Sequence, residues 1–164
     1  MSEKKSMLDG EKQYHIQLKE GDIADFVILP GDPGRVDFIA QHFDNPKEIA
    51  FNREYKTVTG TYEGRPVSVT STGIGCPSAA IAIEELANIG AKTLVRIGTS
   101  GAMQEHTRVG DFVIANGAVR QEGTSPQYMP MAVSYTHLRA HETPEQLGWR
   151  GGREKKKWGG GGGG

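Results

Sequence analysis

Two short turns that combine glycine with arginine are the parts of this sequence best suited to holding an anion. The first is the stretch GDPGR at residues 31–35, and the second is the stretch RIGTSG at residues 96–101. Glycines let backbone N–H groups approach an anion closely, and the planar guanidinium group of arginine matches a phosphate. A helix that begins at Pro33 would add the positive end of its dipole. Phosphate binding is therefore the chemistry that these turns indicate.

Each turn also has a simpler structural interpretation. The first could be only a strand-to-helix turn with Arg35 in solvent. Arg96 lies two places before a glycine that ends a predicted strand, so its side chain would point into a sheet layer, where a charge needs a partner. A core carboxylate such as Glu84 or Glu85 would then neutralise it. On spacing alone, both interpretations stay open.

A third glycine turn, STGIGCPS at residues 71–78, opens the clearest predicted helix. It nearly matches the dinucleotide-binding pattern G-x-G-x-x-G, with Ser78 in place of the third glycine. That pattern also requires an acidic residue at the end of the next strand, where this chain has Arg96. Since arginine suits the 2′-phosphate of NADP, an NADP-linked oxidoreductase is an alternative. The single cysteine, Cys76, is interpreted as a small packed thiol and not as a nucleophile.

Apolar runs and turn residues predict the elements that position these turns. Strands are expected over residues 24–30, 55–62, 66–72, 93–97 and 111–115, and helices after Asp32, which would be the N-cap, and over residues 76–89. Strands and helices that alternate at this spacing predict an α/β sheet with right-handed crossovers. Because ligands bind at the carboxyl ends of strands in open α/β sheets, we expect the three glycine turns to converge on one pocket.

The composition fits one domain and argues against several classes of partner. The chain has 164 residues, of which 24% are charged, and its formal net charge is -1. This balance indicates neither a nucleic-acid surface nor a membrane surface. The sequence lacks a secretory signal and any apolar run near the ~20 residues of a membrane span, and one cysteine allows no intrachain disulfide. We expect a cytoplasmic protein without nucleic-acid or membrane partners.

The two ends of the chain differ from its middle. Residues 1–14 are polar, and we expect a flexible segment there. From about Ala132 the pattern of strands and helices stops, the run SYTHLRAHET resembles translated sequencing-adapter read-through, and the chain ends in a run of glycines. Residues 132–164 are therefore interpreted as a non-native, disordered tail.

The middle of the chain resembles the nucleoside phosphorylase-I family. The matching blocks read YHIQLKEGD, LPGDPGRV, FNREY, STGIGCPSAAIAIEEL, RIGTSGAMQ and VGDFVIANGAVRQEGTSPQY. The REY, TGIG and EGTSPQY blocks are most similar to the uridine phosphorylase branch, whereas purine nucleoside phosphorylases share the Gly-Asp-Pro and Gly-Thr-Ser-Gly blocks. The resemblance implies a three-layer αβα fold around a central mixed β-sheet, of which residues 15–131 would form the N-terminal half.

The resemblance also implies an activity and a phosphate site. Members of the family cleave a nucleoside with inorganic phosphate, giving the free base and ribose 1-phosphate, and they need no organic cofactor. The implied phosphate-binding residues are Gly31, Arg35, Arg96 and Thr99. The enzyme class that follows is a pentosyltransferase, with phosphate as the co-substrate.

Further sites are implied between subunits. Arg53 would reach the phosphate of a neighbouring subunit, and His15 would reach the ribose 5′-hydroxyl there. A monovalent cation, usually potassium, would bind Glu54, Ile74 and Ser78. Judged from the residues alone, Arg53 and Glu54 are an ordinary surface pair. Shared sites imply a dimer, assembled as a hexamer in the family.

The resemblance covers about half of a family chain. The residues that read the uracil edge and bind the ribose hydroxyls lie in the other half, so no uracil-binding residue is expected here. The parent protein is predicted to be a uridine phosphorylase, whereas this truncated chain is expected to be inactive and to expose an apolar face. The alternatives are a purine nucleoside phosphorylase of the same family, the NADP-linked oxidoreductase, and a chain that binds phosphate and does nothing more.

Overall fold

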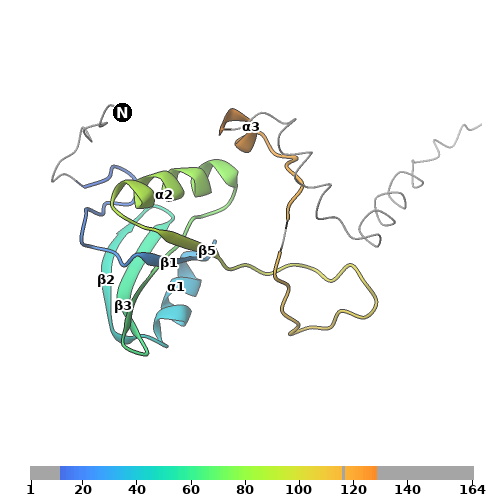
Figure 1. Cartoon of the computed structure of the whole chain (residues 1–164), viewed down its shortest axis with the longest axis horizontal. Coiled ribbons are helices and arrows are strands. Elements are labelled where there is room, and N and C mark those ends of the chain that lie inside the picture. Colours follow the sequence, from blue (N-terminus) through green and yellow to red (C-terminus); the bar gives the residue numbers. More distant parts are fainter. Residues whose placement is uncertain (1–11, 116, 129–164) are drawn as a thin grey trace, which may run out of the picture. The chain divides into compact units, whose positions relative to one another are not determined.

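The computed structural model describes residues 12–115 and 117–128, and the chain divides into two compact units, residues 1–105 and 106–164. The elements of the first unit are β1 (Phe26–Leu29), α1 (Pro33–Ala40), β2 (Asp44–Asn52), β3 (Tyr55–Tyr62), β4 (Arg65–Thr70), α2 (Cys76–Asn88) and β5 (Thr93–Arg96) (Figure 1). The second unit contains the short helix α3 (Ser125–Tyr128). None of the described helices has the length and apolar character needed to cross a membrane. The predicted tail, 132–164, and residues 1–11 of the predicted flexible segment lie outside the described residues.

The strands form one mixed sheet in the order β2-β3-β4-β1-β5. Strand β1 is parallel to its neighbours β4 and β5, whereas β3 is antiparallel to β2 and β4. The β3–β4 hairpin turns at Glu63 and Gly64, which have φ angles of 49° and 74°. Two positive φ angles are typical of the tight turns that match the twist of a hairpin. The predicted mixed α/β sheet is confirmed, and the predicted strands at 55–62 and 66–72 correspond to β3 and β4.

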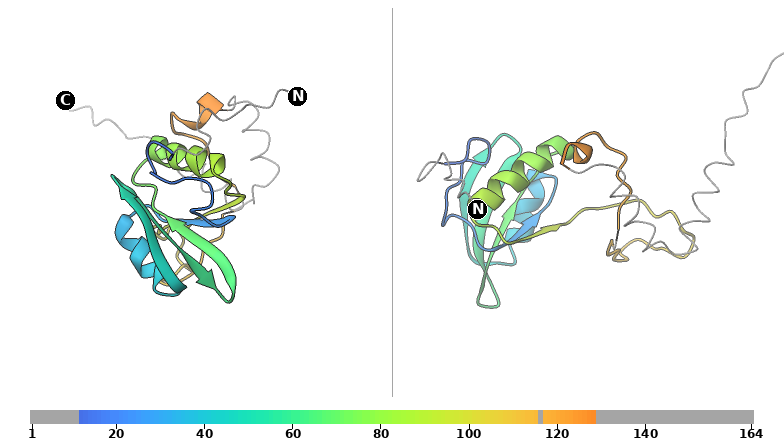
Figure 2. Two further views of the ribbon diagram at one scale, coloured as in Figure 1. Left: turned by 90° about the vertical axis from the view of Figure 1, so that its left-hand side faces the viewer. Right: turned by 45° about the horizontal axis from the view of Figure 1, so that its top comes forward.

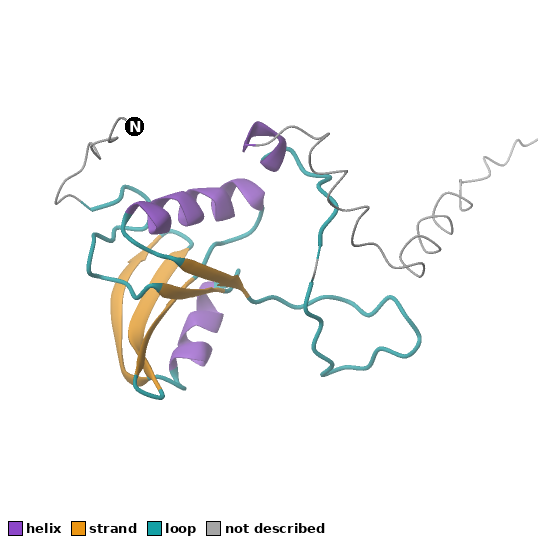
Figure 3. Cartoon of the chain, in the orientation of Figure 1, coloured by secondary structure: helices purple, strands orange, loops and turns teal. Residues whose placement is uncertain are grey.

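Helices α1 and α2 cover opposite faces of the sheet, which Figure 3 and the two views of Figure 2 make clear. Side chains of β1 alternate between these faces: Val27 and Leu29 pack in the cluster that contains Leu86 of α2, while Ile28 packs against the cluster that contains Val36 of α1. Successive side chains of a strand point to opposite faces, so an apolar strand of this kind is buried on both sides. The predicted three-layer arrangement is confirmed.

The residues at the N-termini of α1 and α2 explain why each helix begins where it does. The Asp32 carboxylate accepts a hydrogen bond from the backbone N–H of Gly34 at 2.9 Å, and Pro33 occupies the first turn of α1. Both features match the predicted N-cap. Helix α2 begins after Gly75, which has a φ angle of 101°, and its first turn contains Pro77.

Strand β2 lies outside the sequence-based prediction. Its sequence, DNPKEIAFN, is mostly polar, contains Pro46, and lacks a buried residue. It forms an edge of the sheet and pairs with β3 with irregular register. Edge strands tolerate proline and can be solvated on one face, so neither apolar alternation nor an absence of proline marks them in a sequence.

Two predictions about individual segments are wrong. Residues 111–115 form no strand, and the side chains of Phe112 and Ile114 are 99% and 93% exposed. A strand needs a neighbouring backbone to pair with, and among the described residues none pairs with this segment. Cys76 is exposed at the start of α2 and is not a packed thiol.

Candidate functional site

The carboxyl ends of β1, β4 and β5 meet at one end of the sheet. Beyond the strands, backbone hydrogen bonds tie the turns together: Gly73 N donates to Gly31 O at 2.9 Å, and Ile97 N donates to Leu29 O at 3.1 Å. The three glycine turns therefore converge, as the sequence predicts.

Gly31 leaves room for the guanidinium group of Arg96. A Cβ atom on residue 31 would lie 3.2 Å from Arg96 Nη2 and 3.4 Å from Gly73 O. Arg96 Nη1 donates hydrogen bonds to Leu29 O at 3.0 Å and to Ile97 O at 3.3 Å. The backbone at the end of β1 thus anchors a planar cation, and the absent side chain of glycine permits the close approach.

Arg35 supplies a second cation at the same end of the sheet. Its Nη2 atom donates to Thr99 Oγ1 at 3.4 Å, which joins the start of α1 to the turn after β5. Both Arg35 and Arg96 are exposed, and within the described part of the chain neither forms an ion pair with a carboxylate. We call Gly31, Arg35, Arg96 and Thr99 the arginine site.

The interpretation of Arg96 as the partner of a core carboxylate is wrong. Glu84 is exposed, and the carboxylate of Glu85 binds His15 instead. Arg96 also does not lie in a buried layer, because β5 is an edge strand with exposed side chains at its end. Its charge is therefore solvated, and no buried partner is required.

Ser78, in the first turn of α2, gathers oxygen atoms from several segments. Its Oγ atom lies 3.0 Å from Glu54 Oε1, 2.5 Å from Thr72 O and 3.2 Å from Tyr55 Oη. A hydroxyl group has one proton, so Ser78 donates to only one of Glu54 and Thr72 at a time. This group of residues, which we call the serine site (Glu54, Tyr55, Thr72 and Ser78), therefore has more acceptors than protons to satisfy them.

The ionisation of Glu54 and Tyr55 fits this arrangement. The pKa of the Glu54 carboxyl is lowered from 4.5, first by a hydrogen bond from its own backbone N–H and then by the Ser78 hydroxyl. The charges of Arg53 and His15 lower that pKa further, against an opposing effect of burial. Burial raises the pKa of the Tyr55 phenol from 10.0, so Tyr55 keeps the proton that it can donate to Ser78.

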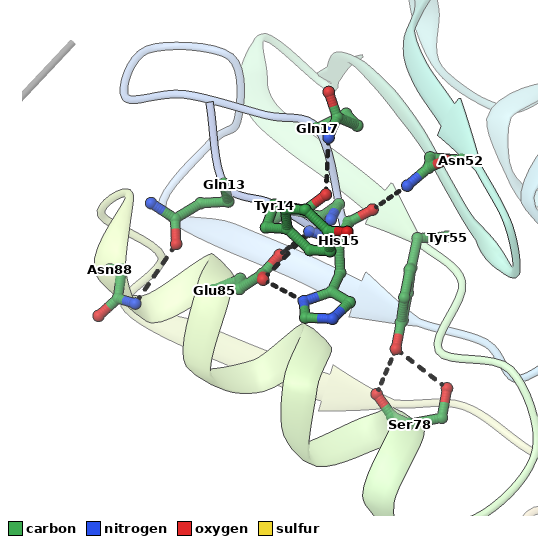
Figure 4. Close-up of polar contacts among 10 residues, drawn as sticks. Gln13, Tyr14, His15, Gln17, Asn52, Tyr55, Ser78, Glu85 and Asn88 are labelled. Carbon is green, nitrogen blue, oxygen red and sulfur yellow. Dashed lines mark hydrogen bonds and ion pairs between the residues drawn. The ribbon is translucent and has the colours of Figure 1, made fainter. Parts of the chain in front are cut away.

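His15 lies in the turn before β1 and is held by Glu85 of α2 (Figure 4). Its Nδ1 atom is 2.6 Å from Glu85 Oε1, and its backbone N–H donates to Glu85 Oε2 at 3.0 Å. The backbone N–H of Ile16 donates to the same oxygen at 2.8 Å, and Asn52 Nδ2 donates to His15 O at 2.7 Å. These contacts fasten the segment around His15 to α2 through Glu85 and to β2 through Asn52.

Two of the predicted site residues lie apart from these contacts. Arg53 is exposed in the turn between β2 and β3, with a φ angle of 53°, and no contact among the described residues joins it to Arg35 or Arg96. Ile74 lies in the third glycine turn with its side chain 99% exposed. The structure thus brings together the four residues of the arginine site, and separately Glu54 with Ser78.

Sequence reasoning missed two residues of these sites. Glu85 is 70 residues away from His15 along the chain, so no local spacing joins them. The available signal was only a pair of glutamates in the otherwise apolar helix sequence AAIAIEELA, of which one faces inward. Tyr55 is read from the sequence as a strand residue, and its buried hydroxyl needs a partner that the sequence does not identify.

Comparisons with known proteins agree with the resemblance. Residues 25–146 match the model of the phosphorylase superfamily, which runs past the predicted boundary at residue 131; that boundary stays a prediction. The chain is 56% identical over 143 residues to a uridine phosphorylase of Thermococcus kodakarensis, covering 84% of this chain and 52% of the relative. It is 53% identical over 117 residues to a guanosine phosphorylase of Halorubrum lacusprofundi, covering 71% of this chain and 48% of the relative.

A solved structure gives the same result. The crystal structure of a uridine phosphorylase from Vibrio fischeri is similar with a TM-score of 0.73 and 44% identity, over 78% of this chain and 52% of that chain. The chain spans about half the length of the relatives that it matches. Sequence and fold therefore agree, and the chain belongs to the phosphorylase superfamily.

Proposed function

We propose that this chain is the phosphate-binding half of a uridine phosphorylase. The observation that carries the proposal is the arginine site, where Arg35 and Arg96 lie at the carboxyl ends of the strands with no carboxylate partner among the described residues. An exposed pair of guanidinium groups beside glycine turns suits an inorganic phosphate. Phosphate is then the co-substrate, and the chemistry needs no organic cofactor.

In the proposed reaction, phosphate attacks C1′ of the nucleoside and the base leaves. Arg35 and Arg96 would neutralise and orient the phosphate, and Thr99 and the Gly31 turn would fix its position. Holding the phosphate against the sugar replaces a bimolecular encounter with an aligned one. An anion beneath C1′ also stabilises the positive charge that develops on the sugar in the transition state.

Uridine is proposed as the nucleoside because the relatives include several uridine phosphorylases at 43–57% identity. A purine nucleoside is the second candidate, since the guanosine phosphorylase of Halorubrum lacusprofundi is 53% identical over the matched region. The family match favours both over an NADP-linked oxidoreductase. We further propose a cytoplasmic location.

A potassium site and a shared dimer site belong to the same proposal. Glu54, Ile74 and Ser78 would hold the cation, with Ile74 contributing through its backbone. The surplus of oxygen acceptors around Ser78 and the anionic Glu54 support a hard monovalent cation there. Arg53 and His15, which are separate from the arginine site in this chain, would act on the active site of a neighbouring subunit in a dimer or hexamer.

The proposal can be tested by supplying the second half from a relative. Residues 1–128 of this chain would be fused to the second half of the Thermococcus kodakarensis uridine phosphorylase, and uracil release from uridine would be followed with and without phosphate. We expect cleavage that requires phosphate and is abolished by Arg96→Ala. A folded fusion protein that releases no uracil, assayed beside the active Thermococcus enzyme, would reject the proposal.

The purine alternative is tested in the same way. A second fusion would carry the matching half of the Halorubrum guanosine phosphorylase, and both proteins would be assayed with uridine and guanosine. If this chain supplies only the phosphate site, base preference follows the second half. A preference that stays with this chain in both fusions would instead place base recognition within its own residues.

A further inference from the structure

The contact between Glu85 and His15 is more elaborate than an ordinary surface ion pair. One carboxylate meets the ring Nδ1 atom of His15 at 2.6 Å, the backbone N–H of His15 at 3.0 Å and the backbone N–H of Ile16 at 2.8 Å. The side chain of Glu85 is 12% exposed, so these contacts largely replace water around it. The arrangement orders both the backbone and the ring of His15.

The backbone contacts establish which partner carries the proton. Backbone N–H groups only donate, so Glu85 must accept from His15 and Ile16. Hydrogen bonds of this kind favour the ionised form of a carboxyl group. An ionised carboxylate has no proton to give, and the Nδ1 atom of His15 is therefore the donor of the short contact.

The other ring nitrogen is left available. A neutral imidazole with its proton on Nδ1 has a lone pair on Nε2, which makes Nε2 an acceptor. No hydrogen bond to Nε2 occurs among the described residues, and the His15 side chain is 30% exposed. The ring is also packed edge-on against Tyr14, with a centroid distance of 4.9 Å, which restricts its rotation.

We propose that Glu85 is a positioning residue, which holds His15 as the Nδ1–H tautomer and so presents Nε2 as the acceptor for a hydroxyl group of the ligand. An alcohol donates a hydrogen bond to such an acceptor, whereas an anionic group would be repelled by the nearby Glu85 carboxylate. The identity of that hydroxyl rests on the proposed function, in which a sugar is bound. The tautomer itself does not depend on that function.

The test is a nitrogen NMR measurement of the histidine rings in the full chain at pH 8.5. The chain has five histidines, so the His15 signals would be assigned by their loss in His15→Gln. We expect His15 to show a protonated Nδ1 and an unprotonated Nε2. In Glu85→Gln we expect its two nitrogen shifts to move toward each other as the Nε2–H tautomer becomes populated. If Glu85 only stabilised the fold, its substitution would not change which ring nitrogen of His15 carries the proton.

Glu84→Gln is the matched control, because Glu84 precedes Glu85 on the same helix, is exposed, and makes no hydrogen bond or ion pair within the described residues. It should leave the His15 signals as in the wild type. A wild-type His15 that carries its proton on Nε2, or unchanged His15 signals in a folded Glu85→Gln, would overturn the proposal. If Glu85→Gln unfolds, the His15 tautomer measured in the wild-type protein still tests the proposal. Because this readout involves no turnover, a failure of phosphorolysis and a failure of the positioning role can be told apart.

Discussion

The arginine site and the serine site occupy adjoining turns, yet they satisfy their polar groups in opposite ways. In the serine site Glu54, Tyr55 and Ser78 bond to one another and to the backbone. In the arginine site Arg35 and Arg96 bind a hydroxyl group and backbone carbonyls, and meet no carboxylate within the described residues. The polar groups of the serine site find partners within the protein, although oxygen acceptors are in surplus there, whereas the arginine site keeps two uncompensated charges.

Because of this difference, we expect the serine site to contribute to folding stability and the arginine site to contribute to anion binding. A buried or half-buried network that supplies its own partners contributes to folding, and removing one member leaves the others unsatisfied. Exposed cations contribute little to folding, but they attract an anion from solution. We therefore expect substitutions in the serine site to change the free energy of unfolding, and substitutions in the arginine site to change phosphate affinity.

The largest effect is expected at Gly73, which joins the two sites. Its φ angle is 68°, and a Cβ atom there would lie 2.6 Å from Glu54 Cγ and 2.9 Å from Ser78 Oγ. Gly73→Ala should lower the free energy of unfolding by about 2–4 kcal/mol, from backbone strain and overpacking together. Urea denaturation followed by circular dichroism measures this change.

Gly64→Ala is the matched control for Gly73→Ala. Gly64 has a φ angle of 74°, but a Cβ atom there would meet nothing within 4 Å. This variant should show only the backbone cost, roughly 1 kcal/mol. Equal losses in the two variants would mean that the crowding around Gly73 relaxes freely, and the serine site would then not be a rigid structural unit.

Arg96→Ala should separate binding from stability most sharply. Removing this guanidinium group should weaken phosphate binding at least about tenfold, because the proposed site would lose one of its two cations. The free energy of unfolding should change by less than about 1 kcal/mol, since the side chain is exposed. A phosphate titration monitored by NMR and a urea denaturation curve give the two quantities.

Arg65→Ala serves as the control for Arg96→Ala. Arg65 begins β4, so it lies at the opposite end of that strand from the glycine turns. Its removal takes away the same formal charge and should leave phosphate binding nearly unchanged. If both variants weakened binding equally, phosphate would be responding to net charge and not to the arginine site.

Ser78→Ala should have the opposite effects to Arg96→Ala on stability and on phosphate binding. The substitution removes the hydroxyl that contacts Glu54, Tyr55 and Thr72, so about 1 kcal/mol of stability should be lost while phosphate affinity in the same titration stays unchanged. Ser100→Ala, at an exposed position in the turn after β5, is the comparison variant. A loss of phosphate affinity in Ser78→Ala would show that the two sites are coupled.

The sequence predicted the arginine site better than the serine site, and local patterns explain why. Glycine turns after apolar strands are local signals, so the positions of Gly31 and Arg96 could be inferred from neighbouring residues. The contacts of Ser78 with Glu54 and of Glu85 with His15 join residues 24 and 70 positions apart, and no local pattern encodes them. Family resemblance named Glu54, Ser78 and His15, but it did not name Tyr55 or Glu85.

The strands teach the same lesson. The segments TLVR, which forms β5, and DFVIA, at residues 111–115, are both short apolar runs, but only β5 is a strand. Residues 93–96 pair in register with 26–29 of β1, whereas residues 111–115 have no pairing partner among the described residues. A short apolar run therefore predicts the capacity to form a strand, and a neighbouring backbone determines whether the strand forms.

The smallest expected effect is a change in the pH dependence of stability when Glu54 is replaced. The pKa of Glu54 is lowered in the folded chain, so its contribution to stability is complete above the unfolded value of 4.5 and is lost as the pH falls through the folded value. Glu54→Gln should therefore make the free energy of unfolding fall less steeply below pH 4.5, and this change should be smaller than the Ser78→Ala effect because Glu54 is only partly buried. Urea denaturation at pH 7 and at lower pH measures how steeply the free energy of unfolding falls with pH. Arginines do not titrate in this pH range, so the free energy of unfolding of Arg96→Ala should fall with pH as steeply as that of the wild type. If the free energy of unfolding of Glu54→Gln fell equally steeply, the acid-sensitive group would lie outside the serine site.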